Sequence, residues 1–78
     1  MDKIKLIWDF RGSTDLQVAT HYTKHIVEFL EEKNIKFFDI GGQSISEFHQ
    51  LAFAIINKED VNLVKNALKP HRALIVKF

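Results

Sequence analysis

Apolar and polar residues alternate in the segment 3–12. The even positions are apolar: Ile4, Leu6, Trp8 and Phe10. The odd positions are mostly polar, and a period of two is typical of a strand with one buried face. The pattern therefore predicts a central strand that carries the core, followed by a turn at Arg11-Gly12 into a helix.

Residues 15–33 repeat apolar side chains at the 3.6-residue spacing of an α-helix. The predicted buried stripe consists of Leu16, Ala19, Thr23, Ile26, Val27 and Leu30. Thr14 and Gln17 fit a capping box, in which each side chain satisfies an end amide of the other. Asn34 is expected to end this helix.

Residues 35–40 and 48–56 are rich in β-branched and aromatic side chains, so they predict a second and a third strand. Gly41-Gly42 is expected to break the second strand. The short polar gap that follows predicts a hairpin between the two strands.

A second helix is expected between Asn57, which would cap it, and Pro70, which cannot continue a helix. Its predicted buried stripe consists of Val61, Val64 and Leu68. Residues 72–78 alternate again and predict a fourth strand. The order β-α-β-β-α-β predicts one α+β domain over residues 1–78, a ferredoxin-like sandwich. Its four-stranded antiparallel sheet would have the order 4-1-3-2, with two helices on one face.

Helices cover only one face of such a sheet. We expect the helix side to carry Ile4, Leu6, Trp8, Leu51, Phe53, Ile55, Leu74 and Val76. The open face would then carry Lys5, Ile7, Asp9, Gln50, Ala52, Ala54, Ile56, Ala73 and Ile75. A face this apolar predicts an interface at Ile7, Ala52, Ala54 and Ile75, either a homodimer packed sheet to sheet or a bound partner. The alternatives are small residues that water tolerates, or a register shifted by one residue, which would exchange the faces.

Composition narrows the function classes. The 78 residues include no cysteine, which excludes disulfides, thiolate metal sites and a cysteine nucleophile. The net charge of +1 comes without a basic block or an acidic tail. No signal-like or bilayer-length apolar run is present, so we expect a soluble cytoplasmic protein that needs no membrane and no cofactor.

The first turn is a candidate ligand site. Arg11, Gly12, Ser13 and Thr14 combine a cation, a flexible residue and two hydroxyls at a helix start, which suits a phosphate or carboxylate. The alternative is a capped helix in which Arg11 pairs with a nearby acid. Gly12 stands alone, so the segment is neither a Walker motif nor a dinucleotide fingerprint.

His21 and His25 are a candidate metal pair. Residues four apart lie one above the other on a helix, so both imidazoles could reach one ion, with Glu28 nearby. The alternative is a solvated helix face. This pair and Arg11 also define the competing hypothesis, a metal protein or small enzyme working in a dimer cleft. No catalytic residue is identified from the order of residues alone.

RNA-binding sheets of this topology stack bases on aromatic rings of the open face. The assigned open-face positions, Ile7, Gln50, Ala52 and Ala54, carry no ring, so we expect no nucleic-acid partner. The function that remains is a small binding or interaction module, with a small anion or metabolite as a possible ligand.

The element order, the glycine-bearing turn DFRGSTDL and the strand that begins at NIKFF resemble ACT-type regulatory domains. That resemblance implies a dimer that binds amino acids or other small ligands, with Arg11, Gly12, Ser13 and Thr14 at the ligand. The first helix is longer here and the turn lacks the proline of that family. The segment IKLIWDFRG followed by HxxxH also resembles small bacterial proteins without an assigned activity.

Overall fold

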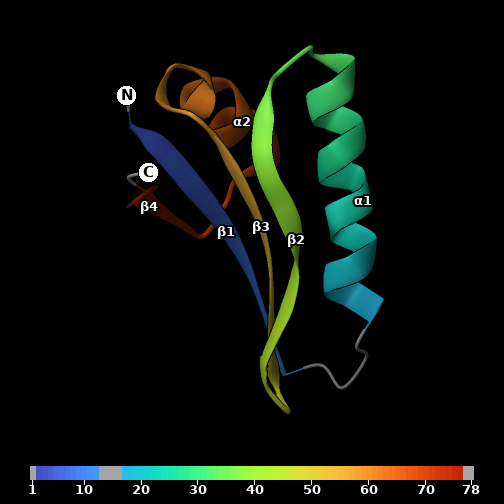
Figure 1. The fold of residues 1–78 in the computed structure, drawn as a ribbon. Coiled ribbons are helices and arrows are strands. Elements are labelled where there is room, and N and C mark those ends of the chain that lie inside the picture. The colour runs from blue at the N-terminus through green and yellow to red at the C-terminus, as the bar shows by residue number, and fades with distance from the viewer. Residues whose placement is uncertain (1, 13–16, 77–78) are drawn as a thin grey trace.

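The computed structural model describes residues 2–12 and 17–76 (Figure 1). The elements in chain order are β1 (Lys3–Arg11), α1 (Gln17–Glu32), β2 (Phe37–Ser46), β3 (His49–Asn57), the 3-10 helix η1 (Lys58–Asp60), α2 (Val61–Leu68) and β4 (Arg72–Val76). This succession confirms the predicted alternation of strands and helices. The capping box, with Thr14, and residues 77–78 of the predicted fourth strand fall outside the described residues.

β1 lies in the interior of an antiparallel sheet with the order β2-β3-β1-β4, which is the predicted order. It pairs with β3 along its whole length, from Lys3 opposite Asn57 to Arg11 opposite His49. On its other side, Lys3 lies opposite Val76 and Ile7 opposite Arg72. The chain is therefore an α+β protein with a four-stranded antiparallel sheet and two helices, an arrangement compatible with a ferredoxin-like fold.

The core lies between the sheet and both helices. Its buried cluster consists of Ile4, Leu6, Trp8, Ile26, Leu30, Ile35, Ala52, Ala54, Ile56 and Val64. Residues of α1 and α2 belong to this one cluster, so both helices cover the same face of the sheet. Figure 1 shows α1 running beside β2.

Trp8 joins β1 to both helices. Its indole Nε1–H donates to the carbonyl oxygen of Leu68 over 2.8 Å, and the Tyr22 hydroxyl donates to the same oxygen over 3.2 Å. The rings of Trp8 and Tyr22 are 5.7 Å apart between centroids. The last carbonyls of a helix lack partners within the helix, so these two bonds fix the end of α2 against β1 and α1.

α1 ends where the sequence predicted. Asn34 adopts a left-handed φ of 57°. Its amide donates to Glu31, and the Ile35 amide donates to Leu30 over 2.8 Å. This pair of bonds is the Schellman ending, which places an apolar residue back against the helix. Ile35 is accordingly buried.

The two glycines do not break the second strand, contrary to prediction. β2 continues through Gly41 and Gly42, and the hairpin turn comes later. A Cβ on Gly42 would lie 3.5 Å from the Cβ of Ala19, an ordinary van der Waals distance, so this glycine lies where α1 packs on the sheet. A Cβ on Gly41 would lie 3.5 Å from the ring of Phe53, on the opposite face.

Asn57 does not cap the second helix as predicted. It precedes η1 and makes no side-chain cap bond, while its Oδ1 accepts a hydrogen bond from Lys3 Nζ over 3.3 Å. α2 ends at Leu68, and Lys69 turns the chain with a φ of 49° before Pro70.

The face assignment of the third strand was wrong by one residue. Leu6 lies opposite Ala54 and Trp8 opposite Ala52, so both alanines face the helices and are fully buried. Physical volume explains the error, because the small alanines leave room for the large β1 side chains and the helices above them. The odd residues of β3 therefore lie on the open face: His49, Leu51, Phe53, Ile55 and Asn57.

The fourth strand is reversed in the same way. Ile4 lies opposite Ile75, which places Ile75 on the helix side, and Lys5 lies opposite Leu74 on the open face. Ile75 remains 66% exposed because β4 is an edge strand. Of the proposed dimer contacts only Ile7 keeps its assigned face, and it is only 3% exposed. The homodimer itself stays a prediction.

The corrected register also changes the argument about nucleic acids. Phe53 lies in the middle of the open face, paired with Ile7. Lys5 Nζ is 4.6 Å from the centre of its ring. The predicted absence of rings from this face was therefore wrong, and the expectation of no nucleic-acid partner loses the observation on which it depended.

Candidate functional site

One carboxylate on the open face of β1 holds side chains from the two neighbouring strands, β3 and β4. Asp9 lies on β1, and its side chain is only 10% exposed. Its Oδ1 accepts a bond from His49 Nε2 of β3 at 2.7 Å. Arg72 of β4 donates through Nε to Oδ2 at 2.9 Å and through Nη2 to Oδ1 at 3.0 Å. This two-pronged contact fixes the plane of the guanidinium as well as its position.

His71 completes the cluster from the segment before β4. Its Nδ1 accepts a hydrogen bond from the backbone amide of Asp9 over 2.8 Å, and its own amide donates to the Ile7 carbonyl over 2.9 Å. A ring nitrogen that accepts carries no proton, so neutral His71 is protonated on Nε2. His49 has the same tautomer when neutral, because its Nε2–H donates to Asp9 and its Nδ1 is the acceptor.

Arg11 lies beside this cluster. It is the cross-strand partner of His49 and is exposed. The cluster of Asp9, Arg11, His49, His71 and Arg72, which we call the Asp9 cluster, contains both arginines of the chain and two of its four histidines. Cations therefore outnumber the single carboxylate even when both imidazoles are neutral.

Opposing effects act on the pKa of Asp9. Partial burial raises the pKa of its carboxyl group. The hydrogen bonds from His49 and Arg72, together with their positive charges, lower the pKa by more than burial raises it. The net pKa lies below its ordinary value of 3.8. Asp9 is therefore ionised at neutral pH and holds its partners as a full anion.

The lowered pKa predicts a dependence of stability on pH. A carboxyl group whose pKa is lower when folded stabilises the fold fully above its unfolded pKa, and this contribution is lost as the pH falls through the folded value. At pH 7 we expect the free energy of unfolding of the parent to exceed that of Asp9→Asn by about 1–2 kcal/mol. The gap should shrink from about pH 5 downward. Urea unfolding at a series of pH values measures it.

Asp39→Asn is the matched control for that experiment. Asp39 is exposed, and its carboxylate accepts a bond from the neighbouring Ile40 amide. The free energy of unfolding of Asp39→Asn should differ little from that of the parent at every pH. A gap between the parent and Asp9→Asn that stays constant down to pH 3 would contradict the assigned role of the Asp9 carboxylate.

The predicted first-turn site is only partly described. The Gly12 amide donates to the Phe48 carbonyl over 2.9 Å, so it is committed to the end of the β2–β3 hairpin. Its φ of 80° is a conformation that glycine adopts without strain. Ser13 and Thr14 lie outside the described residues. Of the four residues predicted at this turn, Arg11 is the one that belongs to the Asp9 cluster.

The histidines of α1 lie near each other, with ring centroids 6.3 Å apart. His25 Nδ1 is 4.0 Å from Glu28 Oε2, and both side chains are more than half exposed. Within residues 2–12 and 17–76, no group of three or more His, Cys, Asp or Glu side chains is placed to hold a metal ion. The metal site at His21, His25 and Glu28 stays a prediction.

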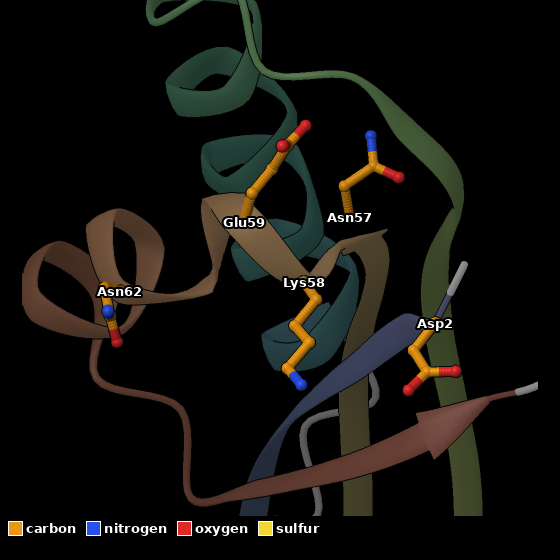
Figure 2. Close-up of a pocket in the computed structure, with 5 residues that line it drawn as sticks. All are labelled: Asp2, Asn57, Lys58, Glu59 and Asn62. Atoms are coloured by element: carbon orange, nitrogen blue, oxygen red, sulfur yellow. The ribbon is translucent and has the colours of Figure 1, made fainter.

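A depression of about 480 Å³ lies at the opposite end of β1 (Figure 2). Its lining residues are Asp2, Asn57, Lys58, Glu59 and Asn62. In Figure 2 the side chains of Asn57 and Glu59 point away from those of Asp2 and Lys58. These polar groups do not converge on one point, so the depression does not have the arrangement of a binding site.

Sequence reasoning missed His49, His71 and Arg72 as partners of Asp9. The sequence did carry a usable signal. Asp9 lies on a strand predicted to be central, and an acid that is partly buried there needs a partner. Arg72 begins the strand that the predicted order places beside β1. His49 could not be found in this way, because the assumed register placed it on the helix side.

The described helices include none that is both long and apolar enough to cross a membrane. The resemblance to ACT-type domains stays a prediction. No family model, curated protein or solved structure matches this chain.

Proposed function

We propose that this chain is a binding module with a ferredoxin-like fold that takes a small anionic group, a phosphate or a carboxylate, at the Asp9 cluster. The observation that supports it is the fixed guanidinium of Arg72. Two of its five N–H groups bond to Asp9, which leaves three for a ligand. Its side chain is 47% exposed, so these donors are open to solvent.

Asp9 acts in this proposal as a positioning residue. A carboxylate that is 10% exposed and bonded on both oxygens orients Arg72 and His49 before any ligand arrives. Donors fixed in advance lose less side-chain entropy on binding than free ones. The exposed Arg11 and the Nε2–H of His71 supply further donors at the same end of the sheet.

The same geometry favours a second candidate, general-base chemistry. A histidine held by a carboxylate at 2.7 Å has a fixed tautomer and an acceptor nitrogen, which is how such bases are oriented in hydrolytic enzymes. Binding alone needs no reacting group, so a ligand recovered unchanged favours the binding module over this enzyme.

Titration with inorganic phosphate at low ionic strength tests the binding proposal. We expect backbone amide shifts in ¹H–¹⁵N spectra to concentrate at residues 9–11, 49 and 71–72. Arg72→Ala should raise the dissociation constant about tenfold, the usual effect of losing a charged hydrogen-bonding group. Arg72→Lys should recover only part of this, because an ammonium lacks the planar fork.

Lys65→Ala is the control for a general loss of positive charge, since Lys65 is exposed on α2. It should bind phosphate as the parent does. Shifts scattered over the whole surface, or equal affinity in the parent and Arg72→Ala, would contradict the proposal.

A further inference from the structure

Positive charge extends from the Asp9 cluster over the rest of the open face. The described cations of this face are Lys3, Lys5, Arg11 and Arg72. The described carboxylates of the same face are Asp9 and Asp39, and Asp9 is already bonded to Arg72 and His49. The whole chain has a net charge of only +1, so the basic character of this face is local.

Aromatic rings lie between these cations. Arg72, Ile7 and Phe53 form one row across the strands β4, β1 and β3. Lys5 Nζ is 4.6 Å from the centre of the Phe53 ring, and Lys3 Nζ is 4.0 Å from the centre of the Phe38 ring. Phe38 is 37% exposed at the edge strand β2. Each ring thus has a flexible cation directly beside it.

We propose that the open face binds single-stranded nucleic acid, with bases on Phe53 and Phe38 and phosphates on Lys3, Lys5 and the Asp9 cluster. Ring faces alternating with basic side chains on a sheet are the arrangement by which proteins hold unpaired strands, because every base has a face that stacks. The proposal rests on the proposed anion site for one phosphate, and it adds the two rings and two lysines.

Lys3 and Lys5 do not prevent a base from stacking on the rings of Phe38 and Phe53. A lysine side chain has a long flexible stem, so Nζ can leave the ring for a phosphate while a base takes its place. The ring of Phe53 leans over Gly41, where a larger residue would fill the space beside it. Phe53 is half-buried, and its apolar neighbours on this face, Ile7, Leu51 and Ile55, are buried around it.

Fluorescence anisotropy with labelled oligo(U) and oligo(dT) of about twelve nucleotides tests the proposal, a length within the usual site sizes. We expect binding that weakens with salt. Phe53→Leu, which keeps an apolar side chain but removes the ring, should weaken binding about tenfold. Lys3→Ala/Lys5→Ala should lower the slope of log K against log[salt] by about 1.4, since each lysine contributes about 0.7 on a single strand.

Two controls separate the open face from other surfaces. Phe48→Ala removes a ring that is 54% exposed at the hairpin turn, and Lys24→Ala/Lys65→Ala removes two exposed charges from the helices. Both should bind as the parent does. Circular dichroism melts establish that each variant is folded, and Phe38→Ala gives a second ring variant at an exposed position.

The outcomes are distinct. Binding of either probe with these losses in the ring and lysine variants supports the proposal. Parent-like binding by folded Phe53→Leu and Phe38→Ala, or equal losses in the helix variants, overturns it. A parent that binds neither probe overturns it as well. Phosphate shifts at the Asp9 cluster without oligonucleotide binding would leave the anion site standing and remove only this extension.

Discussion

Trp8→Ala is expected to lower the free energy of unfolding by about 3–5 kcal/mol, the usual cost of removing a large buried aromatic side chain. Trp8 is 2% exposed and contacts the core from the central strand. The variant also loses the indole bond to Leu68. For 78 residues a total stability of about 4–12 kcal/mol is usual, so this loss should remove a large share of the total.

Urea unfolding followed by circular dichroism measures this loss, and Trp8→Phe separates its two causes. Phenylalanine keeps a ring in the core but cannot donate, while the Leu68 carbonyl keeps its bond from Tyr22. We expect Trp8→Phe to cost much less than Trp8→Ala. Leu63→Ala, at a side chain that is 48% exposed on α2, is the surface control and should cost little. A Trp8→Ala variant as stable as Leu63→Ala would mean that Trp8 is not in the core.

Ala54→Asp is expected to prevent folding, whereas Phe53→Asp should give a folded protein. Ala54 is fully buried beneath the helices, opposite Leu6. A carboxylate there would be buried without a partner, which costs several kcal/mol. Phe53 lies on the open face beside Lys5, where a carboxylate meets water and a cation.

The comparison between these neighbours determines the register of β3, because adjacent residues of a strand face opposite sides of the sheet. Circular dichroism and the dispersion of amide signals report whether each variant is folded. A folded Ala54→Asp together with an unfolded Phe53→Asp would support the opposite register and would remove the rings from the open face.

Sequence patterns predicted the elements well where polar and apolar positions alternate clearly. β1 has lysines and an aspartate between its apolar residues, so both faces were assigned correctly at Ile4, Leu6 and Trp8. Residues 50–56 of β3 are nearly all apolar on both faces, so alternation could not determine which side was inward. The assignment placed Leu51, Phe53 and Ile55 on the helix side. The actual rule is complementarity of volume across the pair, with Trp8 opposite Ala52.

The complete candidate site depends on that register, because His49 could not be placed beside Asp9 without it. Asp9 was correctly assigned to the open face, but its partners come from strands far away in the chain, and their order of pairing decides which of them reach it. The two glycines were misread for a related reason. A glycine in a strand can mark a turn or a close approach, and the sequence alone does not distinguish them. Here Gly42 lies against Ala19.

The central place of β1 has a consequence for synthesis on the ribosome. β1 is made before its two sheet neighbours, and Lys3 finds its partner Val76 only after every other described element has been made. Until β3 is made, the apolar residues of β1 have no neighbouring strand of the sheet. The α1 helix and the β2–β3 hairpin can form earlier because their contacts are local. β1 is therefore made before the other strands of this sheet but is among the last to become fully paired, and its apolar residues are exposed during that interval.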